Sequence, residues 1–202
     1  MSRWSCWTDR LSHAVRTFIA ANFDPALREQ IHAAAAPLRD AAPNVAWVAS
    51  HLLHVTLKFL GEQHADFIAR LTASLQSIAG GHAAASVRLQ GYGAFPNFRK
   101  PRVVWMGGEQ PPVLETLARA ADDACAALGI QREQRPFRAH VTLGRVRREL
   151  GRHEARRLEE TAALRHESFS WHVRSIDIMR SELGRAGPTY TVLDSLSLAA
   201  IT

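Results

Sequence analysis

His54-Val55-Thr56-Leu57 and His140-Val141-Thr142-Leu143 are identical tetrapeptides that lie far apart in the chain. Successive side chains of a β-strand point to opposite faces, so each tetrapeptide would present His and Thr together and bury its two apolar residues. At a rise of about 3.3 Å per residue, His and Thr lie roughly 6–7 Å apart, close enough to contact one small anion. Two such strands facing each other would form a symmetric pocket of two imidazoles and two hydroxyls.

Coincidence is the simplest alternative explanation for the two tetrapeptides. Each could be an ordinary half-buried strand, in which Thr56 and Thr142 serve only strand propensity, because β-branched residues favour strands. Short motifs also mislead easily. The repetition argues against this alternative, because a chain of 202 residues with ten His offers few chances for an identical pair.

Strands and helices are predicted around both tetrapeptides. Asp24-Pro25 predicts the start of a helix that ends at Pro43, and Gly129 predicts the end of another. A similar succession in both halves predicts an internal duplication, with residues 15–198 as one bilobed α+β domain and residues 1–14 as a leader. We expect strands near 15–22, 45–48, 54–60, 86–92, 103–105, 139–146, 169–180 and 189–198, and further helices near 64–79, 112–128 and within 147–166.

Further motifs, in a specific order, surround the tetrapeptides. With them, the chain resembles the two-histidine (2H) phosphoesterase superfamily, most closely its bacterial RNA 2',3'-cyclic phosphodiesterases, also called 2'-5' RNA ligases. The sequence departs from the family pattern at Ala139, where Pro is usual, and in the leader. The resemblance runs from about Arg16 to Leu198 and includes Arg16–Ala20, Trp47-Val48, His54–Glu62, Gly93–Pro96, Pro101–Trp105, Arg135–Arg138, His140–Val146 and Ser181–Leu183.

The resemblance implies a fold and an activity. The fold would be a pseudo-twofold duplication in which two antiparallel sheets flank a central cleft, with helices packed outside. The activity would be the hydrolysis of RNA 2',3'-cyclic phosphate ends to 2'-phosphate ends. His54 would donate a proton to the ribose 3'-oxygen, His140 would accept one from water, and Thr56 and Thr142 would bind the phosphoryl oxygens. Spacing alone does not distinguish the acid from the base.

Arg145 is a further candidate for phosphate binding, because family members often carry a basic residue there. It stands five residues after His140, which places it on the wrong face of a regular strand. It can reach the site only if the strand ends or bulges near Gly144; otherwise it is a solvated arginine. Lys58 shares the parity of His54 and is a weaker candidate. Loop residues that could contact a base or a neighbouring phosphate, unless they serve packing or solvation, are Phe95, Phe98 and Arg102.

The sequence predicts no cofactor and no metal. His51, His54 and His64 are close in sequence, but they lack a Cys partner or a helical His-x-x-x-His pattern. A Gly-rich phosphate-binding loop of the Walker type is also missing. We therefore expect metal-independent acid–base chemistry, and ligation driven by ATP is disfavoured.

Composition suggests where the protein works and what it binds. Lys and Arg outnumber Asp and Glu by 25 to 19, which gives a net charge of +6. This balance suits RNA ends or oligonucleotides as partners, although genomes rich in G and C also favour Arg. Cys6 and Cys125 have no metal-type spacing and suit a reducing compartment. Without a long apolar run or a secretory signal, we expect a cytoplasmic monomer that does not bind membranes.

Two other functions stay open on the sequence alone. The same chemistry would suit a phosphodiesterase or a reversible ligase that acts on 2'-5' linkages. A different class of protein, an RNA-binding module, would use the basic surface without catalysis.

Overall fold

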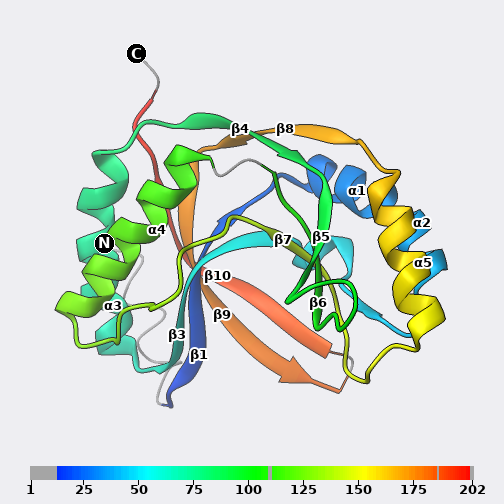
Figure 1. Ribbon diagram of the computed structural model, residues 1–202. Coiled ribbons are helices and arrows are strands. Elements are labelled where there is room, and N and C mark those ends of the chain that lie inside the picture. Colours follow the sequence, from blue (N-terminus) through cyan, green and yellow to red (C-terminus); the bar gives the residue numbers. More distant parts are fainter. Residues whose placement is uncertain (1–12, 109–110, 186, 201–202) are drawn as a thin grey trace.

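The computed structural model describes residues 13–108, 111–185 and 187–200, and Figure 1 shows it as a ribbon. The predicted leader, including Cys6 but not His13 and Ala14, lies outside the described residues. So does Ala186, which belongs to the predicted turn between the last two strands.

Eight strands form one antiparallel sheet in the order β10-β9-β1-β3-β7-β6-β5, and β2 pairs with β7 at the side of this path. Two further strands form a separate antiparallel pair. The predicted antiparallel α+β class is therefore confirmed. The strands of the large sheet are β1 (Val15–Asn22), β2 (Ala46–Trp47), β3 (His54–Gln63), β5 (Tyr92–Phe95), β6 (Val103–Met106), β7 (Val141–Arg145), β9 (Ser175–Gly184) and β10 (Gly187–Ser197), and the separate pair is β4 (Ala85–Gln90) with β8 (Ser168–Val173).

The two tetrapeptide strands, β3 and β7, are neighbours within the large sheet. Their register is given by a single antiparallel residue pair, Val55 with Val141. Strands β10, β9 and β1 continue the sheet beyond β3, and β6, β5 and β2 extend it beyond β7. The strands of the two predicted lobes thus belong to one sheet and meet where β3 pairs with β7, whereas the expectation gave each lobe a sheet of its own. Side-by-side pairing is what brings both His-Thr segments to one place.

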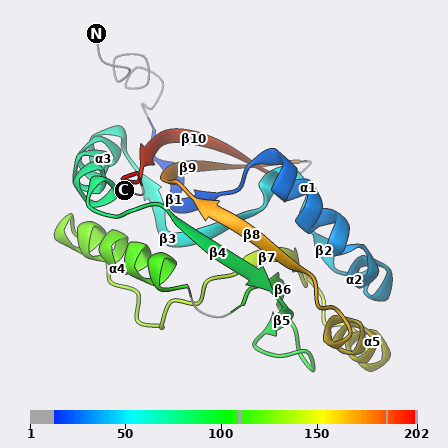
Figure 2. The same cartoon turned by 90° about the horizontal axis from the view of Figure 1, so that it is seen from above.

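Helices flank the β4–β8 pair on both sides (Figures 1 and 2). Helices α3 and α4 contact each other on one side, and α2 and α5 contact each other on the other side, next to α1. None of the helices in the described ranges is long and apolar enough to cross a membrane. The helices are α1 (Pro25–Ala34), α2 (Ala36–Ala41), α3 (Ala65–Gly80), α4 (Pro112–Ala127) and α5 (Arg152–Ala163), with a short 3₁₀ turn, η3, at Ser50–Leu52.

The main hydrophobic core lies against one face of the large sheet and includes residues of α1, α3, α4 and the β4–β8 pair. Val55, Leu57 and Val141 from the tetrapeptides are buried in it, together with Leu71 of α3 and Leu117 of α4. The predicted apolar side of both tetrapeptides is therefore the core side. The His and Thr residues of the same strands are left on the opposite face, which the helices do not cover.

Several predicted element boundaries are confirmed. Asp24 caps α1, where its Oδ1 accepts a hydrogen bond from the Leu27 amide over 2.8 Å. Gly129 follows the end of α4 with a φ of +92°, a conformation that favours glycine. The polar segment 147–166 contains α5, with Leu158 fully buried.

Three predicted elements are each divided in two. The first helix breaks at Ala35, because Pro37 in the first turn of α2 has no amide hydrogen to continue the helical ladder. The strand predicted at 86–92 breaks at Gly91, which has a φ of +77°. The strand predicted at 169–180 breaks at Arg174: β8 pairs with β4, whereas β9 pairs with β1. In the last two cases the segments on either side of the break join different sheets.

Candidate active site

The pairing of Val55 with Val141 brings the four predicted polar side chains together. Antiparallel register around this pair places His54 beside Thr142 and Thr56 beside His140. Both valines are fully buried, so the neighbouring His and Thr side chains lie on the opposite, open face. The structure therefore has the arrangement that the repeated tetrapeptide predicted: two imidazoles and two hydroxyls on one surface.

His54 is held by hydrogen bonds at both ring nitrogens. Its Nδ1 lies 2.8 Å from the Leu52 carbonyl oxygen, which can only accept, so the proton of the neutral ring is on Nδ1. Its Nε2 then accepts a hydrogen bond from the Thr56 hydroxyl over 3.0 Å. Two aromatic rings contact the imidazole: the centroid of Phe18 lies 5.0 Å away, and that of Tyr190 lies 5.3 Å away, edge to face.

His140 is held in an equivalent way. Its Nδ1 donates a hydrogen bond over 2.7 Å to the carbonyl of Arg138, again two residues earlier in the chain. Phe95 contacts the ring edge to face, with 5.1 Å between centroids. In both histidines the backbone therefore fixes the Nδ1–H tautomer and leaves the lone pair on Nε2.

Both imidazoles are harder to protonate than an exposed histidine. The pKa of His54 is lowered to about 4, mainly by burial. The hydrogen bond to the Leu52 carbonyl raises this pKa, whereas the positive charges of Arg28, Arg145 and His140 lower it further. Burial also lowers the pKa of His140, with a further contribution from Arg145 and against the bond to Arg138. The two rings and Arg145 are therefore close enough to interact electrostatically.

Arg145 reaches the open face because β7 contains a bulge. In the pairing of β6 with β7, Val104 is opposite Gly144 and Trp105 is opposite Thr142, so Leu143 is the extra residue. One extra residue inverts the alternation of side chains, which returns Arg145 to the face of Thr142. A bulge near Gly144 was the condition under which Arg145 was predicted to reach the histidines.

A bulge at the same point of β3 has the opposite effect on Lys58. Ile19 pairs with Lys58 and Ala20 with Thr56, so Leu57 is the extra residue. Lys58 consequently turns to the core side, and its suggested role at the phosphate was wrong.

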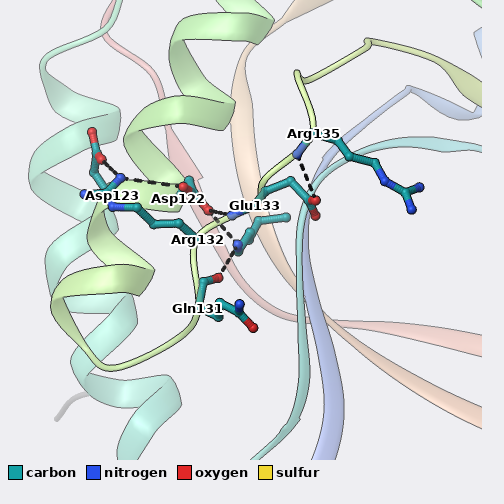
Figure 3. A network of polar contacts seen from close by, with 7 residues as sticks. Asp122, Asp123, Gln131, Arg132, Glu133 and Arg135 are labelled. Atoms are coloured by element: carbon teal, nitrogen blue, oxygen red, sulfur yellow. Dashed lines mark hydrogen bonds and ion pairs between the residues drawn. The ribbon is translucent and has the colours of Figure 1, made fainter.

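The Lys58 ammonium, which is buried, donates to Asp122 Oδ1 of α4 over 2.5 Å and to the Gln131 carbonyl over 2.8 Å. Figure 3 shows the surroundings of Asp122, whose Oδ1 also accepts from the Glu133 amide. The lysine is therefore part of a polar network that ties β3 to α4.

The loop candidates divide between the site and the core. Phe95 lies at the site, where its ring contacts both His140 and Trp105. The ring centroids of Phe95 and Trp105 are 5.2 Å apart. Phe98 packs against the cluster formed by α2, α5 and Val104, away from the histidines. Arg102 is exposed at the start of β6.

A polar chain behind His54 was not predicted from the sequence. Arg28 Nη2 donates to Asn22 Oδ1 over 3.0 Å, and Asn22 Nδ2 donates to Asp177 Oδ2 over 2.6 Å. Arg28 Nη1 also donates to the His51 carbonyl over 3.1 Å, just before the segment that ends at His54. These residues come from β1, α1 and β9, so their spacing in the sequence carries no signal. The same holds for Tyr190, which contacts His54 from β10.

No group of three or more His, Cys, Asp or Glu side chains in the described ranges is placed to hold a metal ion. The carbonyl bonds at both Nδ1 atoms serve a different purpose, because they orient the rings for proton transfer at Nε2. The four side chains, with Arg145, provide an acid or base at two positions and three groups that can donate hydrogen bonds to an anion.

Known proteins are similar to this chain over most of its length. A model of the family described as the 2'-5' RNA ligase superfamily matches residues 23–185. The RNA 2',3'-cyclic phosphodiesterase of Methanothermobacter thermautotrophicus is 32% identical over 185 residues, which cover 91% of this chain and 99% of that protein. The enzyme of the same name from Archaeoglobus fulgidus is 32% identical over 177 residues, or 87% and 96% of the two chains.

Solved structures are similar over nearly the whole chain. The crystal structure of a phosphoesterase matches with a TM-score of 0.72 and 28% identity, and covers 93% of this chain and 99% of its own. The crystal structure of Escherichia coli LigT complexed with 3'-AMP matches with a TM-score of 0.70 and 28% identity, over 92% and 99% of the two chains.

Proposed function

This chain belongs to the 2'-5' RNA ligase superfamily, and from that membership we infer that it is an enzyme, an RNA 2',3'-cyclic phosphodiesterase. Its substrate is an RNA end that carries a 2',3'-cyclic phosphate, and its product is a 2'-phosphate end. The observation that carries this proposal is the convergence of two His-Thr pairs around Val55 and Val141 on one open face. Relatives of the same name cover almost the full chain, which supports the same assignment.

The reaction is an in-line displacement at phosphorus. Water forms the new bond to phosphorus as His140 Nε2 takes its proton, and the bond from phosphorus to the ribose 3'-oxygen breaks as His54 Nε2 gives that oxygen a proton. The net result is the addition of one water molecule. No metal or other cofactor enters the scheme, because each proton has a histidine to supply or accept it.

Binding of the substrate must precede protonation of the acid. The pKa of His54 is lowered to about 4 in the free protein, so its ring is neutral near pH 7. A phosphate anion placed beside the ring favours the imidazolium and raises this pKa. The proposed acid thus becomes protonated when the cyclic phosphate enters. Its Nε2 then no longer accepts a hydrogen bond from the Thr56 hydroxyl and can donate its proton to the substrate.

Thr56, Thr142 and Arg145 would stabilise the charge on the phosphoryl oxygens. The hydroxyls are short and fixed on strands, which suits a pre-organised donor. The Arg145 guanidinium adds a positive charge that already acts on both imidazoles. This set would favour the transition state, where negative charge on the oxygens is greatest.

A second candidate within the same chemistry is the cleavage or formation of 2'-5' linkages, which the family description favours. A 2'-5' linkage is also a phosphodiester at the ribose 2'-oxygen. Its second ester oxygen, however, is the 5'-oxygen of another nucleoside, in the position from which water attacks the cyclic phosphate. In ligation, the 5'-hydroxyl of a second nucleoside would attack phosphorus in place of water as the bond to the ribose 3'-oxygen breaks, and cleavage would be the reverse of that step; neither direction needs a nucleotide cofactor.

The test supplies the protein with two oligonucleotides in the presence of EDTA, one ending in a 2',3'-cyclic phosphate and one with an internal 2'-5' linkage. We expect the cyclic end to open to a 2'-phosphate, which a phosphatase then removes as inorganic phosphate. Faster cleavage of the 2'-5' linkage would favour the second candidate. No turnover of the cyclic end would contradict the first.

An RNA-binding module without catalysis gives a different result with His54→Ala and His140→Ala. If the protein only binds RNA, both variants and the wild type show binding without hydrolysis. If it is an enzyme, each variant loses about 10²- to 10⁴-fold in turnover, the usual contribution of one general acid or base. The expected compartment, the cytoplasm, and the expected monomeric state stay predictions from the sequence, and light scattering of the purified protein checks the second.

A further inference from the structure

Two aromatic rings stand next to His140 on the open face of the sheet. Trp105 is opposite Thr142 in the register of β6 with β7. Opposite residues of neighbouring strands point to the same face, so the indole lies on the face that carries the histidines. The ring of Phe95 contacts the indole, with 5.2 Å between centroids, and contacts His140 edge to face, with 5.1 Å between centroids. We call Phe95 and Trp105 the aromatic pair.

Two glycines provide the space that the indole occupies. Gly93 is opposite Trp105 in the register of β5 with β6, and a Cβ atom on Gly93 would overlap three atoms of the indole. A Cβ atom on Gly107 would lie 2.9 Å from Cζ3 of the same ring and 3.2 Å from the carbonyl oxygen of Ala139. A side chain at either glycine would therefore displace the ring. The indole lies directly against the backbone, beside the residue that precedes His140.

The indole N–H is not what holds Trp105 in place. Its nitrogen is buried and has no hydrogen-bond partner within residues 13–108, 111–185 and 187–200. A buried tryptophan usually finds a partner for this group, and a buried donor without one costs stability. What Trp105 supplies to its surroundings is therefore the size and shape of its ring.

His140 has fewer hydrogen bonds than His54 to fix its ring. Both ring nitrogens of His54 are bound, one by a backbone carbonyl and the other by the Thr56 hydroxyl. Among the described residues, His140 is bound through Nδ1 alone, by the Arg138 carbonyl. A single hydrogen bond leaves the imidazole free to turn about that bond. The ring of Phe95, at 88° to the imidazole, restricts this rotation.

Phe95 depends in turn on the indole. It is the last residue of β5, and the chain leaves the sheet directly after it, so its own strand gives it support on one side only. The tilted contact with Trp105 limits the positions that its ring can take. Without the indole, Phe95 could turn into the space beside it and lose its contact with His140.

The aromatic pair also contributes to the burial of His140. Burial is the largest cause of its lowered pKa, and the charge of Arg145 adds to it, against the hydrogen bond to Arg138. Arg145 of β7 and His54 of β3 face the same ring. A general base must be neutral, so a low pKa keeps the imidazole in the form that accepts a proton.

We propose that Trp105 is a positioning residue for the base: through Phe95 it fixes the plane of the His140 imidazole, so that Nε2 faces the attacking water. This assignment rests on the proposed function and on His140 as the base. Trp105 acts through another ring and not on the reacting atoms. The unused N–H and the two glycines that admit the indole both follow from this role.

The experiment compares Trp105→Leu with Trp105→Phe on an oligonucleotide that ends in a 2',3'-cyclic phosphate. Trp105→Leu should lower kcat by about 10- to 100-fold at its own optimal pH, because a misplaced base loses part of its effect. Its KM should stay within about threefold of the wild type, since the phosphate contacts are kept. NMR titration should show that the pKa of His140 rises, because water reaches the ring. Trp105→Phe keeps a ring and should stay within about threefold of the wild type in kcat.

Gly93→Ala tests the same contact without removing an aromatic ring. The added methyl group displaces the indole, so kcat and the His140 titration should change in the same direction as in Trp105→Leu. Gly80→Ala is the matched control, because a Cβ atom there, at the end of α3, meets no other atom within 4 Å. Trp171→Leu removes a buried tryptophan of β8 and should lower the thermal stability but leave kcat and the His140 titration unchanged.

Four results would overturn the assignment. Wild-type kcat and His140 titration in both Trp105→Leu and Gly93→Ala would show that the indole does not act on the base. A raised KM with unchanged kcat would make Trp105 a binding residue instead. If Trp105→Phe lost as much activity as Trp105→Leu, the N–H and not the ring would matter. No turnover in the wild type would refute the proposed function and, with it, a role in catalysis, whereas the first three results refute the positioning role alone.

Discussion

The side-chain amide of Asn22 donates a hydrogen bond to Asp177 Oδ2 over 2.6 Å. Asp177 is almost fully buried and also accepts hydrogen bonds from the hydroxyls of Ser175 and Ser195. Asn22 in turn accepts from Arg28. This chain therefore fixes the Arg28 guanidinium at the start of β3, where its charge acts on His54.

The first prediction concerns the effect of Arg28 on His54. Arg28→Gln removes one of the positive charges that lower the pKa of His54, so this pKa should rise. It should stay below the ordinary value near 6.5, because burial is the larger cause and does not change. A pH titration of the imidazole signals by NMR measures the shift.

Arg28→Lys is the matched variant, since it keeps the charge and should leave the pKa of His54 close to that of the wild type. Arg152→Gln, which removes an exposed arginine at the start of α5, controls for a general change in net charge. An unchanged His54 titration in Arg28→Gln would show that the charge of Arg28 does not reach the ring.

The second prediction is an acidic optimum for kcat/KM, which reports the ionisation of the free enzyme. One imidazole must be neutral and one protonated, and both pKa values are lowered in the free protein. The fraction of enzyme molecules in which one of the two histidines is protonated is therefore greatest below pH 6.5, between the two apparent pKa values of the coupled pair. The value of kcat reports the bound state, where the phosphate raises these pKa values, so its optimum should lie at higher pH. An optimum of kcat/KM above pH 7 would contradict the environment described for the two rings.

The third prediction concerns Arg145. Arg145→Ala should weaken the binding of inorganic phosphate and make that binding less sensitive to salt, because one charged contact is lost. It should also raise the pKa of both His54 and His140, since the charge of Arg145 lowers both. Isothermal titration calorimetry at two salt concentrations measures the first effect. Arg152→Ala is the control, and equal phosphate affinity in the two variants would exclude Arg145 from the site.

The alternation of apolar and polar residues was sufficient to predict the central part of the site. Val55 and Val141 had to be buried, and His and Thr then had to share the other face. The face of a residue beyond the tetrapeptides was not predictable, because it depends on bulges. The bulges at Leu57 and Leu143 move Lys58 into the core and Arg145 to the open face, whereas regular alternation predicted the reverse.

Contacts between residues far apart in the chain could not be predicted from the sequence. Asn22 and Asp177 are separated by 155 positions, and their contact depends on the pairing of β1 with β9. Division of the strand predicted at 169–180 has a similar cause, because only Arg174 separates β8 from β9 in the chain although the two strands pair in different sheets. Patterns of period two identify a strand but do not identify its partner.

The last prediction concerns stability and the ion pair that β3 forms with α4. The side chains of Lys58 and Asp122 are 6% and 16% exposed, and their charged atoms are 2.5 Å apart. Lys58→Met removes the buried cation and leaves Asp122 with only the longer ion pair to Arg132, so it should lower the free energy of unfolding by about 3 kcal/mol. The double variant Lys58→Met/Asp122→Asn should recover most of this loss, because the amide oxygen can still accept from Glu133.

Acid should weaken the same pair. Burial tends to raise the pKa of Asp122, but the hydrogen bonds from Lys58 and Glu133 and the charges of Lys58 and Arg132 outweigh it, and the pKa is lowered. The unfolded chain therefore takes up this proton first as the pH falls. The contribution of the pair is fully present above about pH 4, the ordinary value for Asp, and is lost as the pH falls through the lowered pKa.

Urea unfolding at pH 7 and pH 3 measures both effects. Arg132→Ala breaks only the exposed contact with Asp123 and a longer one with Asp122, so it should cost much less stability than Lys58→Met. If Lys58→Met cost as little as Arg132→Ala, the ion pair would be no more than a surface contact. In that case the position of Lys58 against α4, which the bulge at Leu57 produces, would not stabilise the fold.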